Sequence, residues 1–319
     1  MKTRINRRGF LHASALAAAV TSSLTRAAES GATGAPRVLA APMPRGKIGK
    51  LSVSRLISGG NLISGWAHSR DLHYVPELMR AYNTEAKVLE TLGVLEEQGV
   101  NTIIADPRKK PMSVFAEHWK RGGKIQWIAE GHPGLDDWKS DIKASIDFGA
   151  SAVYVQGVIG DQWLHQGRLE LLGQCVDYIK SRGVPAGIGA HELEVIVQAE
   201  KQKFGAEFYV KTLHHQKYWS GQRPDQVQPV VDNPADNYWE TDPEKTIRFM
   251  QEVEKPWIAF KVLAAGAISP QSGFQYAFAN GADFICVGMF DFQVAADAEL
   301  ARNLLASPDV QNRQRSWMG

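Results

Sequence analysis

Residues 152–191, AVYVQGVIGDQWLHQGRLELLGQCVDYIKSRGVPAGIGAH, decide the fold of this chain. A short apolar run, Ala152 to Gln156, is followed by an amphipathic stretch, Leu169 to Arg182, and by a second apolar run, Ala186 to Gly189. Apolar residues at helical spacing between two strand-like runs predict a β-α-β unit. Gly183 follows the predicted helix, at the place where a left-handed C-cap is needed before the next strand.

The same alternation extends in both directions from this unit. The other predicted strands are Arg55 to Ser58, Thr102 to Ala105, Ile125 to Ala129, Glu207 to Leu213, Trp257 to Leu263 and Phe284 to Gly288. The other predicted helices are Thr84 to Gln98, Ser113 to Arg121, Leu135 to Phe148, Leu193 to Phe204, Pro243 to Glu254, Ser272 to Asn280 and about Val294 to Leu305, and glycines follow helices at Gly99, Gly122, Gly149, Gly205 and Gly281. About eight repeats predict an α/β fold, a (β/α)8 TIM barrel in a single domain. An open doubly wound sheet is the alternative, but no predicted strand is followed by the Gly-x-Gly-x-x-Gly pattern of dinucleotide-binding sheets.

The N-terminus has the features of an export signal. Arg7 and Arg8 precede Phe-Leu and a run of small and apolar residues, 13–24, and Ala27 and Ala28 offer a cleavage site. This pattern predicts a twin-arginine (Tat) signal over residues 1–30, so we expect the Tat translocation machinery as a partner and a periplasmic or extracellular location. The alternative is a basic tail ahead of an ordinary helix. Residues 31–46, rich in Gly, Ala and Pro, are predicted to be a linker, and residues 47–319 the catalytic barrel.

Charge and cysteine content narrow the range of partners. The net charge is +2 and no basic stripe follows a predicted helix, so we expect no nucleic acid as a partner. The apolar part of the signal is too short, and too rich in Ala and Ser, to remain as a membrane span, and no other segment is long and apolar enough. Cys175 and Cys286 are predicted to be buried core thiols, with a disulfide between them possible in an oxidising compartment.

Two stretches resemble a known family. Residues 47–61, KIGKLSVSRLISGGN, resemble the opening of aldo-keto reductases, where a short hairpin precedes the first barrel strand. Residues 171–190, LLGQCVDYIKSRGVPAGIGA, are similar to the helix and fifth strand of that family. The order of elements agrees over most of the chain after residue 46, so the resemblance implies an aldo-keto reductase-like barrel.

The residues that the family uses around its nicotinamide are mostly absent. The resemblance implies an Asp, a Tyr, a Lys and a His there, and only Asp106 falls in place. No Tyr occurs in residues 107–115, Glu130 replaces the Lys, and Gln156 replaces the His. Residues 288–294 contain no Arg or Lys to bind the extra phosphate of NADPH. We therefore expect the chain to share the fold of this family but to lack its reductase chemistry. NADPH is a less favoured cofactor than a divalent metal.

Polar residues recur where predicted strands end. They are Asp106, Glu130, Gln156, His191, His214 or the adjacent His215, and Lys261, with His132 and Glu192 one or two residues beyond a strand. The carboxyl ends of all strands in such a barrel meet at one mouth, where we expect the active site. Carboxylate and imidazole groups from several strands suit a divalent metal such as Mn, Zn or Fe, with Glu130, His191 and His214 as the predicted ligands. The alternative for each histidine is a hydrogen-bonded structural role.

Two lysines interrupt apolar strands. Lys261 is predicted to point into the barrel, where a desolvated amine can act as a base, an electrostatic stabiliser or a Schiff-base nucleophile. With Asp106 and His191 it forms the predicted catalytic set. An interior lysine can instead pair with a carboxylate. Lys211 interrupts its strand similarly but with opposite parity to His214, so we expect only one of these two to face the interior.

Two long insertions, residues 63–83 and 216–242, are rich in aromatic and imidazole side chains. These are Trp66, His68, His73, Tyr74, Tyr82, Tyr218, Trp219, Tyr238 and Trp239. Flat faces with polar tips suit a sugar-like ligand, so Trp66, His68, Tyr218 and Trp219 are predicted, with Gln156, to bind substrate; the alternative is that they only pack the loops down. Residues 264–270, AAGAISP, and 280–289, NGADFICVGM, resemble the phosphate-binding units of many barrels, which adds Gly266 and Gly288, although such glycines also serve tight turns.

These observations favour an exported barrel enzyme that acts on a small hydroxylated or carbonyl, carbohydrate-like substrate. The expected chemistry is proton abstraction by a metal-assisted lyase, isomerase or epimerase. Two alternatives remain: a divergent NADPH-dependent aldo-keto reductase-like oxidoreductase, and a noncatalytic sugar-binding barrel.

Overall fold

Eight parallel strands close into a barrel in the computed structural model, which describes residues 42–69, 72–221 and 240–319. The strands are β3 (Leu56–Gly59), β4 (Thr102–Ala105), β5 (Gln126–Gly131), β6 (Ala152–Val155), β7 (Ala186–Ala190), β8 (Phe208–Thr212), β9 (Trp257–Phe260) and β10 (Phe284–Val287). Each strand pairs with the next along the chain, and β10 pairs with both β9 and β3 to complete the ring. The predicted (β/α)8 architecture is confirmed, and the open sheet is excluded.

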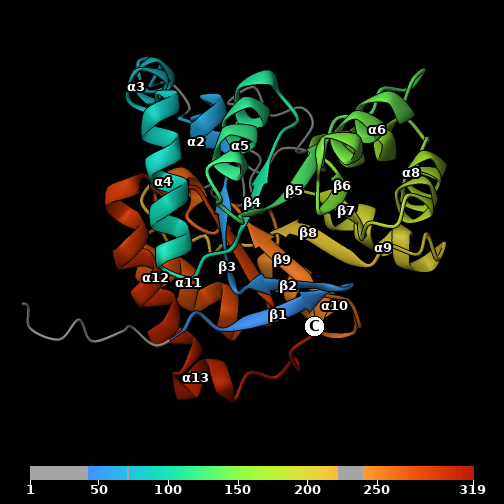
Figure 1. Ribbon diagram of the computed structural model, residues 1–319. Coiled ribbons are helices and arrows are strands. Elements are labelled where there is room, and N and C mark those ends of the chain that lie inside the picture. Colours follow the sequence, from blue (N-terminus) through green and yellow to red (C-terminus); the bar gives the residue numbers. More distant parts are fainter. Residues whose placement is uncertain (1–41, 70–71, 222–239) are drawn as a thin grey trace, which may run out of the picture. The chain divides into compact units, whose positions relative to one another are not determined.

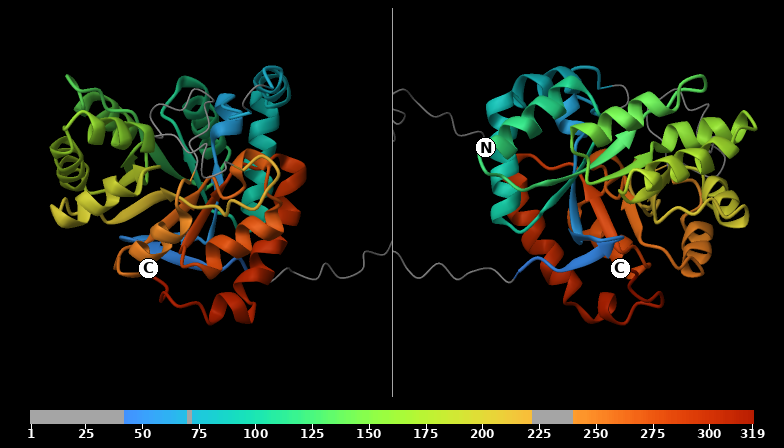
Figure 2. Two further views of the ribbon diagram at one scale, coloured as in Figure 1. Left: turned by 180° about the vertical axis from the view of Figure 1, so that it is seen from behind. Right: turned by 45° about the vertical axis from the view of Figure 1, so that its right-hand side comes forward.

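One or more helices follow each strand around the outside of the barrel (Figures 1 and 2). They are α4 (Glu85–Glu97), α5 (Lys109–Lys120), α6 (Lys139–Phe148), α8 (Glu170–Ser181), α9 (Leu193–Lys201), α10 (Pro243–Gln251), α11 (Pro270–Ala279) and α12 (Asp291–Leu305). All six glycines predicted to end helices have positive φ. The structure adds α2 (Asn61–Ser64) and α3 (Val75–Tyr82) in the first insertion, α7 (Gly157–His165) after β6, a short 3-10 turn (Ala264–Gly266) and α13 (Pro308–Gln311).

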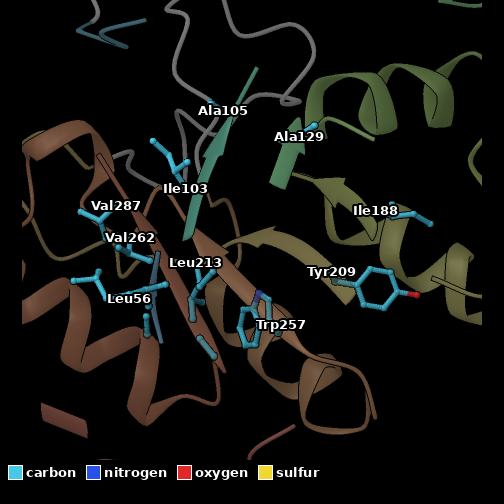
Figure 3. Packing of buried hydrophobic residues seen from close by; sticks show 14 of the residues in the cluster. Leu56, Ile103, Ala105, Ala129, Ile188, Tyr209, Leu213, Trp257, Val262 and Val287 are labelled. Carbon is cyan, nitrogen blue, oxygen red and sulfur yellow. The ribbon is translucent and has the colours of Figure 1, made fainter. Parts of the chain in front are cut away.

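Two apolar clusters hold the barrel together. The larger lies between the strands and the helices, and Figure 3 shows part of it, with Leu56, Ile103 and Trp257 among the labelled side chains. The smaller lies inside the barrel and includes Ile57 and Ile104, the immediate neighbours of Leu56 and Ile103 in the chain. Successive strand residues therefore pack on opposite faces, as parallel strands buried on both sides require.

A β-hairpin precedes the barrel, as the family resemblance implied. It consists of β1 (Arg45–Ile48) and β2 (Leu51–Ser54), and its Ile48 and Val53 join the cluster inside the barrel. The hairpin lies at the opposite end of the barrel from α2 and α3 (Figure 1). Because Met43 is buried and β1 starts at Arg45, residues 42–46 belong to the folded unit and not to the predicted linker. Residues 1–41 of the predicted signal and linker, and Tyr238 and Trp239, lie outside the described residues.

The two cysteines are free thiols. Cys175 is buried as predicted, and burial raises its pKa to about 12. Cys286 is partly buried and packs against the cluster inside the barrel. No helix within the described ranges has the length and apolar character needed to cross a membrane.

Candidate active site at the barrel mouth

The predicted polar residues lie at the carboxyl ends of six neighbouring strands. Asp106 directly follows β4, Glu130 is the penultimate residue of β5, and Gln156 directly follows β6. His191 directly follows β7, His214 comes two residues after β8, and Lys261 directly follows β9. Because the strands are parallel, these residues share one end of the barrel, as the sequence predicted.

Glu130 is the centre of a hydrogen-bonded cluster. Tyr154 Oη donates to its Oε2 at 3.0 Å and Gln156 Nε2 donates to its Oε1 at 2.8 Å. His132 Nε2 lies 3.3 Å from Oε1. Burial alone would raise the pKa of Glu130, but the hydrogen bond and charge of His132 and the two other donors bring it below its usual value. Burial lowers the pKa of His132, but the hydrogen bond and charge of Glu130 outweigh burial and raise it above its usual value, so the pairing favours a carboxylate with an imidazolium.

Tyr154 is a site residue that the sequence analysis missed. It lies inside a strand of apolar residues, where its aromatic ring is expected in a core, and only its hydrogen bond to Glu130 reveals a polar role. Burial, followed by the charge of Glu130, raises the pKa of its phenol well above the usual value. Burial and Glu130 also raise the pKa of Cys286. The phenol and the thiol both stay protonated beside the carboxylate.

His191 is held by a second residue that the sequence did not reveal, Asp161 of α7. His191 Nδ1 lies 2.7 Å from Asp161 Oδ2, and the His191 backbone N–H donates to Oδ1 at 3.1 Å. Asp161 is fully buried, and burial raises its pKa to about 7. Burial and the charges of Lys261 and Lys211 lower the pKa of His191 well below its usual value. His191 is therefore a neutral imidazole, in contrast to His132.

Lys261 lies on the mouth side of its strand in a strained conformation. The predicted strand through Leu263 ends at Phe260, and Lys261 has φ +55, in the left-handed region. A residue other than glycine in that region costs about 1–3 kcal/mol, and such strain is concentrated at functional sites. The charge of Lys261 lowers the pKa of both His191 and His214, so its ammonium group lies within electrostatic reach of both.

His68 reaches the same region from the loop after β3. Its charge also lowers the pKa of His191, and its Nε2 lies 3.0 Å from Asn61 Nδ2. His68 has φ +48, so this loop also holds a side-chain-bearing residue in the left-handed region. The structure thus places the predicted substrate-binding residue His68 near His191.

Lys211 forms a buried ion pair that the sequence analysis did not foresee. Its Nζ lies 2.6 Å from Glu240 Oε2, and Glu240 belongs to the far end of the second insertion. The Glu240 backbone N–H donates to His214 Nε2 at 3.0 Å, and His214 Nδ1 donates to the His215 carbonyl at 3.0 Å. Lys211 and His214 therefore both contact Glu240, Lys211 through its ammonium group and His214 through a ring nitrogen that accepts the backbone N–H. The alternative of a lysine paired with a carboxylate holds for Lys211.

The predicted metal ligands do not form a ligand set. Both ring nitrogens of His214 are hydrogen-bonded to backbone groups, and burial lowers its pKa to about 4. His191 gives one nitrogen to Asp161, and both oxygens of Glu130 accept hydrogen bonds from neighbouring side chains. Within residues 42–69, 72–221 and 240–319, no three His, Cys, Asp or Glu side chains are grouped so that they could hold a metal. These residues do not fit the metal centre that the sequence predicted.

Asp106 organises the rim of the mouth. Its carboxylate accepts hydrogen bonds from Ser64 Oγ at 2.5 Å and Trp66 Nε1 at 3.2 Å, and it pairs with Arg108 Nε at 2.9 Å. The Arg108 guanidinium lies over the Trp66 ring, 4.6 Å from its centre. Asp106 therefore ties the loop after β3 to the loop after β4. Trp66 remains 41% exposed, which leaves part of its surface for a ligand.

The aromatic residues before the second gap differ in their surroundings. The ring of Tyr218 lies edge-on to His214, with 5.9 Å between ring centres. Trp219 is 92% exposed. Tyr218 is thus close to the site, whereas Trp219 is not packed against it.

Gly266 and Gly288 were predicted to bind an anion, but their contacts are with the backbone. The Gly266 N–H donates to the Leu263 carbonyl at 2.9 Å, and the Ile268 N–H donates to the same carbonyl at 3.0 Å. At Gly288 the chain passes close to Gly59, where a Cβ on Gly59 would lie 3.0 Å from the Gly288 nitrogen. The N–H groups of Gly266 and Ile268 are thus already used inside their own loop and do not point to an anion. The tight-turn alternative accounts for Gly266, and at Gly288 the backbone passes close to Gly59.

Solved structures with a similar backbone include aldo-keto reductases. One, a Pseudomonas aeruginosa protein described as an aldo-keto reductase, has 13% sequence identity and a TM-score of 0.58, covering 85% of this chain and 100% of that chain. A second structure described in the same way has 14% identity and a TM-score of 0.53, covering 82% and 95% of the two chains. No protein-family model and no curated protein sequence matches the chain. At these identities the likeness is one of fold: the chain has an aldo-keto reductase-like (β/α)8 barrel.

Proposed function

We propose that this chain is an enzyme that transfers a proton at a carbon next to the carbonyl group of a small hydroxylated, carbohydrate-like substrate, as a lyase, isomerase or epimerase. The observation that carries this proposal is the contrast between two imidazoles at one mouth. Burial and the charges of Lys261 and Lys211 lower the pKa of His191 well below its usual value, whereas Glu130 raises the pKa of His132. A neutral and a charged imidazole are a base and an acid that can work in the same reaction.

The roles follow from the charges. His191 takes the proton from carbon, and the electron pair of the C–H bond moves toward the carbonyl to form an enolate. The ammonium group of Lys261, which already acts on His191 electrostatically, stabilises the negative oxygen. His132 then gives its proton to the same carbon from the opposite face in an epimerase, or to a departing oxygen in a lyase. In an isomerase it protonates the former carbonyl carbon, while the proton of the neighbouring hydroxyl passes to the enolate oxygen. Exchange with solvent restores both imidazoles.

Exchange of hydrogen for deuterium tests this proposal without knowledge of the product. The full chain is incubated in D2O with a panel of small hydroxy-aldehydes, hydroxy-ketones and hydroxy-acids, and NMR follows loss of the C–H signal next to each carbonyl. We expect at least one compound to exchange faster than without protein. His191→Gln and Lys261→Met should each slow that exchange by about 100-fold or more, the usual effect of losing an acid–base group.

Lys201→Met is the matched control for the lysine, because Lys201 is exposed at the last residue of α9, where the chain returns to the start of β8. It should exchange at the rate of the unchanged protein. Exchange at the protein-free rate across the panel, or equal exchange with His191→Gln, contradicts the proposal.

A further inference from the structure

We propose that Asp161 is a positioning residue that decides which ring nitrogen of His191 carries the proton, and that α7 is packed against β7 in order to deliver it. The inference rests on the proposed role of His191 as a base. To the proposed site it adds Asp161, which does not touch substrate, and α7, an extra helix between β6 and α8.

The close contact of α7 with β7 depends on glycine on both sides. A Cβ added to Gly160 of α7 would lie 2.6 Å from the Gly189 carbonyl oxygen of β7. A Cβ added to Gly189 would lie 2.8 Å from the Gly157 nitrogen. Real side chains do not fit at such distances, so the helix backbone rests directly on the strand. Asp161, the next residue of the helix, is thereby brought to the end of β7.

The carboxylate of Asp161 accepts hydrogen bonds with both oxygens. Oδ1 accepts from the backbone N–H of His191 at 3.1 Å and of Glu192 at 3.0 Å. Oδ2 lies 2.7 Å from His191 Nδ1. An ionised carboxylate is only an acceptor, so Nδ1 must carry the ring proton and Nε2 must carry the basic lone pair. The pair therefore fixes the tautomer that a base needs.

Charged groups around the pair favour the same arrangement. Lys261 of the β9 end, Lys211 of β8 and His68 disfavour a positive charge on His191, whereas Glu130 of β5 favours one. Lys211 and His165 act on Asp161 in the opposite sense and favour its ionised form. The net result is a carboxylate next to a neutral ring, which is the state that places the proton on Nδ1.

A purely structural aspartate is a distinct possibility with a different consequence. If Asp161 only caps the backbone N–H groups of His191 and Glu192, then asparagine can replace it, because the amide oxygen still accepts. The amide NH2 group would then lie next to Nδ1 and donate to it. That hydrogen bond moves the ring proton to Nε2. Asp161→Asn therefore keeps the cap and inverts the tautomer.

NMR of the full chain labelled with 15N-histidine measures the tautomer directly. Spectra are recorded at about pH 8, where Asp161, with its pKa of about 7, is mostly ionised. His191→Gln identifies the His191 signals. We expect the Nδ1-protonated form of His191 to dominate by about tenfold or more, and Asp161→Asn to reverse that excess. Asp136→Asn, at an exposed position, is the matched control and should leave the spectrum unchanged.

Each outcome decides the proposal. Dominance of the Nε2-protonated form or of the imidazolium in the unchanged protein overturns it, even if Asp161→Asn fails to fold. The same tautomer in Asp161→Asn and the unchanged protein also overturns it and leaves only the cap. Gly160→Ala, which forces α7 away from β7, should weaken the Nδ1 preference while Asp161 is retained.

The tautomer is read without any substrate. A protein with the expected tautomer but no hydrogen exchange on the substrate panel retains this inference and loses the proposed function. A protein that exchanges hydrogen on the substrate panel but lacks the expected tautomer retains the proposed function, and Asp161 then has no part in it.

Discussion

In the two carboxylate–imidazole pairs at this mouth the pKa of the imidazole shifts in opposite directions, although the chemical groups are alike. The carboxylate of Glu130 receives two further hydrogen bonds, from Tyr154 and Gln156, which stabilise its charge and with it the charge of His132. The ring of His191 is buried within reach of lysine charges, which keep it neutral. Local donors and burial, more than residue type, decide in which direction the pKa of each imidazole shifts.

The pH dependence of exchange should follow from these two pairs. His191 has the basic nitrogen that the reaction needs only while Asp161 is ionised, so exchange should rise as the pH increases through about 7. It should fall again at higher pH as His132, whose pKa is raised, loses the proton that it donates. Rates of deuterium exchange across the pH range measure both limbs.

Two variants separate the limbs of that profile. Asp161→Asn should abolish the rise near neutral pH and leave exchange slow throughout. His132→Gln should remove the fall at higher pH. A profile in which the acid limb survives Asp161→Asn is incompatible with control of His191 by Asp161.

At the scale of elements, periodicity predicted the strands and most helices well. Thr102–Ala105 agrees with β4 at both ends, and glycines after helices marked the boundaries because left-handed caps need them. Helix α7 escaped prediction because its first four residues include Gly157 and Gly160, which disfavour an isolated helix. Those glycines are required by packing against β7, a tertiary demand that no local pattern reveals.

The site was predictable only in part for a similar reason. Polar residues at strand ends could be found, because the topology sends every strand end to one mouth. Their partners could not be found. Asp161 is supplied by an unpredicted helix, and Glu240 lies 29 residues after Lys211. For the predicted metal ligand His214, the partners already occupy both ring nitrogens that a metal would need.

The connection from β8 to α10 is anchored by the buried pair of Lys211 and Glu240. Glu240 also accepts a hydrogen bond from Thr246 Oγ1 at 3.2 Å, so it links the strand to the helix. Glu240→Ala leaves the ammonium of Lys211 buried without its carboxylate, and it should lower the free energy of unfolding by about 3–5 kcal/mol. Urea unfolding of the full chain measures this change.

The double variant Lys211→Met with Glu240→Leu tests the cause. It removes both charges and should recover most of the stability lost in Glu240→Ala, because a buried pair replaced by apolar groups is often neutral. If the double variant is as unstable as the single one, the loss comes from packing and not from an unpaired charge.

For the barrel as a whole, the two ends carry different tasks. At the end opposite the mouth, Asp283 is fully buried and pairs with Arg313 at 2.9 Å and Arg315 at 2.6 Å. It also accepts a hydrogen bond from the Met318 backbone N–H at 2.8 Å, so the last residues are fastened under the barrel. In barrels of this kind, residues at the mouth carry the catalytic chemistry and residues at the opposite end contribute to stability.

Asp283→Asn should therefore change stability without changing chemistry. Removal of the negative charge leaves two buried guanidinium groups together and should lower the free energy of unfolding by about 3–5 kcal/mol. Deuterium exchange per folded molecule should stay at the level of the unchanged protein, measured well below the unfolding temperature. A large loss of exchange in a folded Asp283→Asn protein would mean that the two ends of the barrel are coupled.

The cellular location is a separate prediction, carried by residues 1–30. If Arg7 and Arg8 form a twin-arginine signal, the barrel crosses the membrane already folded and is cut near Ala27 or Ala28. Changing both arginines to lysine should retain the chain in the cytoplasm at full length, because the signal depends on the arginine pair and not on positive charge alone. Cell fractionation with mass determination of the purified protein measures both effects. A chain that stays uncut in the cytoplasm with its arginines intact supports the alternative of a basic tail, and the proposed acid–base chemistry would then have cytoplasmic substrates.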